Sequence, residues 1–200
     1  MPAVLRPYHP SDQPGLYRVC LATGDAGRDA TPLYRDPDLL GHVYAGPYPV
    51  ADPGLTWVVT DDAGRVAGYV VATADTRAFD DWLEQHWWPV LRARYARRAD
   101  PGDGTRDHVL VDLLHDRSRA DVPAGFPAHL HIDLLPHLQG QGWGRRLVAT
   151  LSDALRARGV PGLHLGVAAQ NTGAVAFYER IGMRVHESFD WGYRMVLPLA

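Results

Sequence analysis

The last third of the chain alternates regularly between strand-like and helix-like segments, and this order restricts the fold more than any other feature of the sequence. A strand, a glycine-rich turn, an amphipathic helix, a second strand, a short helix and a closing strand follow one another closely. Such an order favours a parallel pair of strands joined by a crossover helix. The segments are HLHIDLL (129–135), QGQGWG (139–144), RRLVATLSDALRARG (145–159), LHLGVAA (163–169), NTGAVAFYERIG (171–182) and YRMVLPL (193–199).

The upstream part of the chain predicts further elements around the same sheet. Ser11 is placed to cap a helix, Gly64 suits the turn of a hairpin, and Pro89 interrupts a long helical pattern. We expect one α/β (α+β) domain over residues 1–200, with a mixed, mostly antiparallel sheet, a central parallel strand pair and flanking helices. The upstream assignments are strands at 3–6, 55–60, 65–73 and 109–115, and helices that begin after Ser11 and span 38–44 and 79–98.

Composition excludes several classes of function. A net charge of −3 and a sequence pI near 6.3 do not suit a nucleic-acid-binding domain. The single cysteine, Cys20, excludes an internal disulfide framework, and the sequence has neither a leader-like start nor an apolar run long enough to span a membrane. The expected setting is the cytoplasm, with no membrane partner.

The glycine turn at 139–144 predicts an anion-binding site. A strand that enters a helix through glycines exposes the first unpaired N–H groups of that helix to a ligand. Arg145 and Arg146 lie at the positive end of the helix dipole, and a bound anion would relieve this conflict. A P-loop is absent, and the G-x-G-x-G spacing fits a dinucleotide fingerprint only loosely. The alternative at this point is a tight strand-to-helix corner without a ligand.

A second motif, NTGAVAFY at 171–178, follows the next strand and makes a family resemblance specific. QGQGWG resembles the acyl-CoA loop of the GNAT N-acetyltransferases, and the asparagine-to-tyrosine helix resembles the next motif of that superfamily. DLLGHVYAGPY, GYVVATADTRAF and HLHIDLLP are similar to the acetyltransferase-like C-terminal domain of O-GlcNAcases and to its free-standing bacterial relatives. The O-GlcNAcase domain is regarded as lacking an intact CoA loop, so the intact loop here favours binding of acetyl-CoA.

The resemblance implies roles for individual residues. The main chain between Gln141 and Arg146 is expected to bind the pyrophosphate, and the main chain at the end of the 129–135 strand to bind the pantetheine arm. Asn171 is expected to hold the arm, and Tyr178 to protonate the leaving thiolate. The residues expected to bind acetyl-CoA are Leu134, Leu135, Gln139, Gly140, Gln141, Gly142, Trp143, Gly144, Arg145, Arg146, Asn171, Ala174, Phe177 and Tyr178.

The general base is expected on the 129–135 strand. Alternation places His129, His131 and Asp133 on one face, with the intervening residues on the other. Asp133, which matches the HxD position of the O-GlcNAcase-like domains, is the first candidate and His131 is the second. Two alternatives stand beside this role: an ion pair of Asp133 with a neighbouring side chain, and a metal site that would also use His164. No metal is expected.

The function that follows from the resemblance is an acetyl-CoA-dependent N-acetyltransferase in which a primary amine attacks the thioester directly. The alternative is an acetyl-CoA-binding pseudo-acetyltransferase that acts as a sensor or interaction module. The acceptor is expected to be a small-molecule or peptide amine, and the chain to be a monomer or a homodimer. Residues expected around an acceptor are Tyr44, Tyr48, Asp75, Asp80, Asp81 and Glu84.

Overall fold

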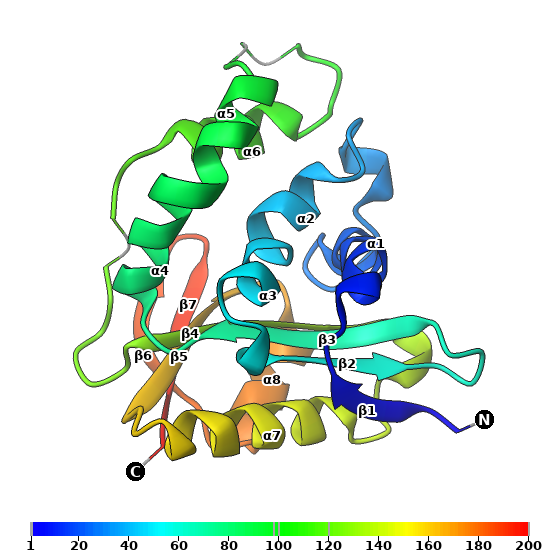
Figure 1. Ribbon diagram of the computed structural model, residues 1–200, viewed down its shortest axis with the longest axis vertical. Helices are drawn as coiled ribbons and strands as arrows, with labels where there is room; N and C mark the ends of the chain where they lie inside the picture. Colours follow the sequence, from blue (N-terminus) through cyan, green and yellow to red (C-terminus); the bar gives the residue numbers. More distant parts are fainter. Residues whose placement is uncertain (1, 98, 100, 120, 200) are drawn as a thin grey trace.

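A twisted sheet forms the centre of the molecule in the computed structural model, which describes residues 2–97, 99, 101–119 and 121–199 (Figure 1). The described residues contain seven strands in the order β1-β2-β3-β4-β5-β7-β6. All neighbours are antiparallel except β4 and β5, which confirms the mixed sheet and its parallel pair. The strands are β1 (Val4–Pro7), β2 (Thr56–Thr60), β3 (Val66–Thr73), β4 (Ala128–Leu134), β5 (Gly162–Ala168), β6 (Arg184–Phe189) and β7 (Gly192–Pro198).

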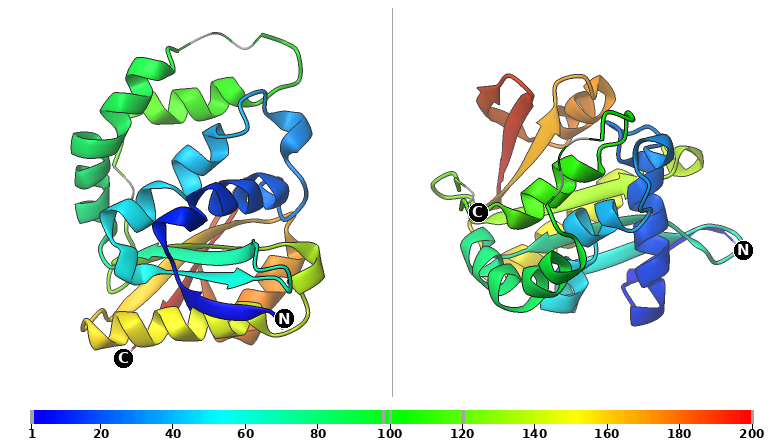
Figure 2. Two further views of the ribbon diagram at one scale, coloured as in Figure 1. Left: turned by 45° about the vertical axis from the view of Figure 1, so that its right-hand side comes forward. Right: turned by 90° about the horizontal axis from the view of Figure 1, so that it is seen from above.

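Helices cover both faces of this sheet. Figures 1 and 2 show α1, α2 and α3 above it and α7 and α8 below it, while α4, α5 and α6 rise away from the sheet on one side. Among the described residues, every helix is too short or too polar to cross a membrane. The helices are α1 (Gln13–Thr23), α2 (Leu39–Tyr44), α3 (Pro47–Ala51), α4 (Thr76–Trp82), α5 (Trp88–Arg94), α6 (Asp107–His115), α7 (Trp143–Ala157) and α8 (Thr172–Arg180).

The sheet separates two hydrophobic cores. On β3, Tyr69 and Val71 pack with the helices of the upper layer, whereas Val70 and Ala72 pack with α7. Leu130 of β4 also belongs to the lower core, as alternation along that strand predicts. The histidines and the aspartate of β4 are therefore on the upper face of the sheet, and its leucines are on the lower face.

Two upstream expectations need correction, and one strand near the end of the chain was not expected. The expected strand at 109–115 is wrong: the segment forms α6, because Leu110, Val111 and Leu114 bury one face at helical spacing. Ser11 does not cap α1 but lies within a short 3₁₀ turn, Pro10–Asp12, whose cap is His9. The strand β6 was not expected, because most of its residues are exposed and its sequence lacks apolar alternation.

The long helix expected at 79–98 is interrupted, as its proline predicts. A π-helical turn, Leu83–Trp87, separates α4 from α5, and Pro89 lies at the start of α5. The last helical residue is Arg94, and Arg98 lies outside the described residues. The tryptophans of this region pack against the upper core, so they have a structural role.

Candidate functional site

The parallel pair β4–β5 separates after a short region of contact. Only Ala128 and His129 are paired with β5, opposite Leu163 and His164. Beyond this point β4 continues along β3 as far as Leu134, and β5 continues along β7. The two central strands therefore diverge and leave a V-shaped split between them.

Main-chain groups of β4 face this split. The Leu135 N–H donates to the Ala67 carbonyl oxygen at 2.9 Å, which makes these two residues a directly bonded antiparallel pair. Because bonding alternates along an antiparallel ladder, the main-chain groups of Ile132 and Leu134 point the other way, towards the β5 side. Main-chain binding of the ligand was expected from both Leu134 and Leu135. Only Leu134 faces the split, because the N–H of Leu135 is already bonded within the sheet.

The glycine turn has the backbone geometry of an open helix start. Gly140 and Gly142 have φ of 72° and 83°, in the left-handed region that favours glycine. Gly142 is the N-cap of α7, and no side chain caps the helix there. The N–H groups of the first turn are therefore free to bind an anion. Gly144 serves packing instead, because a Cβ at this position would lie 3.0 Å from the Phe177 ring.

The split and the glycine turn line one continuous cleft of about 620 Å³, which we call the first cleft. Most of the residues expected to bind acetyl-CoA line it, whereas Leu135, Gln141, Trp143 and Arg146 do not. The Gln141 side chain donates instead to the His137 carbonyl, and the Arg146 guanidinium lies over the Trp143 ring. The expected residues that line the first cleft are Leu134, Gln139, Gly140, Gly142, Gly144, Arg145, Asn171, Ala174, Phe177 and Tyr178.

The charge in the first cleft suits a phosphorylated ligand. Three arginines, Arg28, Arg145 and Arg180, line the cleft, and all three are exposed. Arg28 also pairs with Asp25 at 2.8 Å. Guanidinium groups beside open helix N–H groups are a combination that binds phosphate oxygens. The donor set therefore fits a pyrophosphate group carried on a long, partly apolar ligand.

Tyr178 combines burial with a place in the first cleft. Its side chain is 9% exposed and lines the cleft together with Asp133. Burial raises the pKa of its phenol, and the negative charge of Asp133 raises it further. The phenol therefore holds its proton at neutral pH, as a proton donor must. Asn171 accepts a hydrogen bond from the Ala174 N–H at 3.2 Å, so it caps α8 while lining the same cleft.

The two candidate bases face different spaces. Asp133 lines the first cleft, and one of its oxygens, Oδ2, accepts a hydrogen bond from the Tyr69 hydroxyl at 2.5 Å. Burial raises the pKa of its carboxyl, while the hydrogen bond from Tyr69 lowers it. Burial lowers the pKa of His131 to about 4, so this ring is neutral at neutral pH. His131 lines a second, neighbouring cleft.

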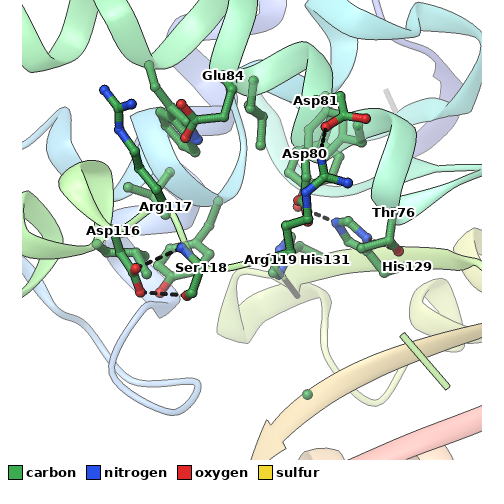
Figure 3. Close-up of a pocket in the computed structure, with 18 of the residues that line it drawn as sticks. Thr76, Asp80, Asp81, Glu84, Asp116, Arg117, Ser118, Arg119, His129 and His131 are labelled. Carbon is green, nitrogen blue, oxygen red and sulfur yellow. Dashed lines mark hydrogen bonds and ion pairs between the residues drawn. The ribbon is translucent and has the colours of Figure 1, made fainter. Parts of the chain in front are cut away.

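The second cleft, of about 640 Å³, lies between β4 and β5 below and the α4–α6 region above (Figure 3). Tyr44 and Tyr48 line it, and the rings of both lie 5.4 Å from that of His131. Asp75 does not line it but caps α4. The two clefts meet along β4, because residues 129–131 line the second and residues 132–134 line the first.

The carboxylates of the second cleft are mostly occupied by partners within the protein. Asp81 pairs with Arg119 at 2.6 Å, an interaction marked by a dashed line in Figure 3. Glu84 pairs with Arg92 at 2.6 Å. These pairs reduce the negative charge that the sequence suggested for a cationic acceptor, so the cleft is mixed in charge rather than acidic.

Ring nitrogens of His129 and His164 are hydrogen bonded within the protein. No group of three or more metal-binding side chains with suitable geometry occurs among the described residues. Thr76 donates its hydroxyl proton to the Pro127 carbonyl, so it accepts from Nδ1–H of His129 at 2.7 Å. The remaining nitrogen of His129 then accepts from the Tyr48 hydroxyl at 2.8 Å. His129 is therefore a neutral structural residue with both ring nitrogens bonded.

Several residues that line the first cleft had no signal in the sequence. They come from the end of α1 and the loop after it, and from the end of α8 and its C-cap, beyond the NTGAVAFY motif. Tyr69 likewise sits inside an ordinary apolar strand, so only strand pairing shows its contact with Asp133. The residues of this kind that line the cleft are Thr23, Ala26, Gly27, Arg28, Arg180 and Ile181.

The histidines at the β4–β5 junction should make the stability of the folded protein depend on pH. Burial lowers the pKa of His129, His131 and His164 in the folded protein. Their stabilising effect is complete above pH 6.5, the ordinary pKa of histidine. It is lost as the pH falls through the pKa of each histidine in the folded protein, which is about 4 for His131. We expect the unfolding free energy to fall by up to about 1.4 kcal/mol per pH unit and per histidine in this range.

Urea unfolding at pH 7, 5.5 and 4.5 measures this loss. His131→Gln should flatten the dependence, whereas His137→Gln, at an exposed position, should leave it unchanged. An identical slope for the wild type and His131→Gln would contradict the assignment.

Comparison with known proteins shows the family of the chain. Residues 107–183 match the model of the Acetyltransferase (GNAT) family. SsHAT, known from a crystal structure, is 39% identical over the full length of both chains, with a TM-score of 0.92. Protein O-GlcNAcase of Rattus norvegicus is 23% identical over 182 residues, which are 89% of this chain but only 20% of that protein. The chain thus spans about a fifth of the length of this relative.

The fold and the split between β4 and β5 define an acyltransferase of the GNAT class, and the chain belongs to the GNAT acetyltransferase family. The same fold occurs in yncA of Salmonella typhimurium, whose structure contains acetyl-CoA as its cofactor. That protein is 18% identical, the match covers 100% of this chain and 95% of that one, and the TM-score is 0.56.

Proposed function

We propose that this protein is an N-acetyltransferase that uses acetyl-CoA as co-substrate and transfers the acetyl group to a primary amine. The observation that supports this most directly is the meeting of two clefts along β4. The first cleft has the open helix start, the arginines and the protonated phenol that acetyl-CoA requires. The second reaches the same strand from the other side and gives an amine a separate route to the thioester.

The first cleft accounts for binding of acetyl-CoA. Main-chain N–H groups of the first turn of α7 bind the pyrophosphate, with Arg145 close beside them. The Leu134 N–H and the main-chain groups of Ile132 bind the pantetheine arm along the open edge of β4, while the Leu134 carbonyl accepts from the Gln139 side chain at 2.9 Å. Rigid backbone donors suit this task, because they are in place before the ligand arrives. When bound, acetyl-CoA supplies an acetyl group activated as a thioester.

The side chains at the junction of the clefts carry the proton transfers. Asp133 takes the proton that the amine loses as its nitrogen forms a bond to the carbonyl carbon. Tyr178 gives its phenol proton to the sulfur as the carbon–sulfur bond breaks. His131, neutral at working pH, lies beside the entry of the amine and is the second candidate for the base. The transfer is direct, without a covalent enzyme intermediate.

The acceptor enters through the second cleft and is a small-molecule or peptide amine. Its walls combine the aromatic rings of Tyr44, Tyr48 and Trp88 with paired charges, so they offer both apolar contact and hydrogen bonds. The test is release of free CoA thiol from acetyl-CoA in the presence of a panel of amines. Release that depends on the amine supports the proposal, and release from none of them, despite binding of acetyl-CoA, contradicts it.

Asp133→Asn should lower kcat/KM by about 10²-fold or more, because the amide is isosteric but cannot accept the proton. In the wild type, kcat/KM should rise with pH through a pKa above the ordinary value for aspartate, since burial raises the pKa of Asp133. Asn at this position should remove that rise. Initial rates between pH 4 and 9 measure both effects.

His131→Gln is the matched comparison for the second candidate base. It should keep most of the turnover and the same acidic limb of the pH profile. If His131→Gln removes the limb and Asp133→Asn does not, His131 is the base and Asp133 is not.

A further inference from the structure

Tyr69 stands directly opposite Asp133 in the sheet. The two residues are register partners on β3 and β4, so their side chains project from the same face. The Tyr69 side chain is fully buried, at 0% exposure, and its hydroxyl donates to Oδ2 of Asp133 at 2.5 Å. A charge-assisted bond of this length is strong and fixes the orientation of the carboxylate. One oxygen of Asp133 is thus engaged with the core while the residue still lines the first cleft.

The remaining groups around Asp133 come from α1, from α8 and from β4 itself. The thiol of Cys20 and the hydroxyl of Thr23 approach from α1, where the Thr23 hydroxyl donates to the Val19 carbonyl at 2.8 Å. Tyr178 approaches from α8, close enough for the charge of Asp133 to raise its pKa. His131 is next on the same face of β4. Of these groups, Tyr69 is the one whose place is set by the sheet register itself, and its ring cannot move without disrupting the upper core.

We infer that Tyr69 is a positioning residue for the base: its hydroxyl locks the Asp133 carboxylate so that the other oxygen faces the reacting amine. This inference rests on the proposed function. The proposed reaction does not require Tyr69, because an aspartate on β4 could serve as base without it. The core does not require the hydroxyl either, since a phenylalanine ring would fill the same space.

Electrostatics gives this role a measurable consequence. A donor to a carboxylate stabilises the ionised form, so it lowers the pKa that burial has raised. Without the hydroxyl, the hydrogen bond that lowers the pKa of Asp133 is lost, while the effect of burial remains. The pKa of Asp133 therefore rises further. A base with a higher pKa is protonated, and inactive, over a wider range of acidic pH.

Tyr69→Phe should therefore move the acidic limb of kcat/KM to higher pH by about one to two units. At a fixed pH on the acidic limb the rate should fall by about tenfold for each unit of this shift, and at high pH it should return towards the wild-type value. The affinity for acetyl-CoA, measured by calorimetry, should not change. Tyr95→Phe is the matched control, because Tyr95 also donates to a carboxylate, Oδ2 of Asp36, at 2.7 Å but lines neither cleft. This variant should not move the limb.

A loss of rate that is equal at every pH, or no change at all, would overturn the role of Tyr69. The ¹³C resonance of the Asp133 carboxyl, assigned by comparison with Asp133→Asn, gives a second measurement that needs no turnover. Its titration in the wild type should lie below that in Tyr69→Phe, and coincident titrations would also refute the inference. If Tyr69→Phe does not fold, Tyr69→Met, a flexible apolar side chain without a hydrogen-bond donor, replaces it in the titration.

Different experimental results would refute the proposed function and the role of Tyr69. Absence of amine-dependent thiol release from the wild type would refute the proposed function, while the carboxyl titration would still report on Tyr69. Normal turnover by Asp133→Asn would remove the base, and with it the positioning role, while leaving the acetyltransferase proposal in place.

Discussion

Tyr178→Phe is expected to lower kcat by about 10²-fold or more and to leave the dissociation constant of acetyl-CoA nearly unchanged. The substitution removes one oxygen atom from a side chain that is 9% exposed, so the packing of α8 against the lower core is kept. What is lost is the proton that the leaving sulfur receives. Calorimetry with acetyl-CoA and initial rates with a competent amine separate the two quantities.

The alkaline side of the pH profile gives a second test of the same role. A proton donor loses activity as the pH rises through its pKa, and burial with the Asp133 charge raises the pKa of Tyr178 above its ordinary value of about 10. Tyr178 should therefore cause no loss of rate below pH 10. A basic limb near pH 8 that disappears in Tyr178→Phe would show that this phenol is not the buried, strongly held acid inferred here.

Tyr17→Phe is the control for loss of a phenol. The Tyr17 hydroxyl is hydrogen bonded to His42 at 2.8 Å and lines neither cleft. Its removal should leave kcat within about twofold of the wild type. Equal rates for Tyr178→Phe and Tyr17→Phe would mean that Tyr178 serves packing alone, and the leaving thiolate would then take its proton from water.

The parts of the site that could be predicted from the sequence are those that depend on local geometry. The glycine turn is one: Gly140 and Gly142 adopt positive φ, a conformation for which glycine is the favoured residue. Alternation along β4 is another, because a period of two follows from the strand alone and separates His131 and Asp133 from Leu130. The NTGAVAFY helix was likewise predictable, since its cap and its length are local features.

Features that depend on contacts between distant segments were not predictable. The contact of Tyr69 with Asp133 needs the register of β3 against β4, which no short pattern contains. The loop that brings Gly27 and Arg28 to the first cleft follows α1, far from both motifs in the sequence. The prediction for 109–115 was wrong because a short apolar run suits a strand or a buried helix equally, and packing decides between them.

Gly142→Glu is expected to weaken acetyl-CoA binding by about 10²-fold or more. Gly142 has φ of 83° at the N-cap of α7, a conformation that costs a residue with a Cβ about 1–2 kcal/mol. The new carboxylate would also lie among the N–H groups that bind the pyrophosphate, where it would compete with the ligand and repel it. Calorimetric titration with acetyl-CoA measures the change, and circular dichroism confirms the fold.

Gly159→Glu separates loss of the binding site from loss of the fold. Gly159 has φ of 72° just beyond the other end of α7, and a Cβ atom there would have open space around it, as at Gly142. The two substitutions are therefore matched in backbone strain and in added charge. The helix has 15 residues, which places Gly159 about 20 Å from the turn. If Gly159→Glu binds acetyl-CoA normally and Gly142→Glu does not, the glycine turn is the anion site. If both bind normally, the turn is only a corner between β4 and α7, and the acetyltransferase proposal loses its main support.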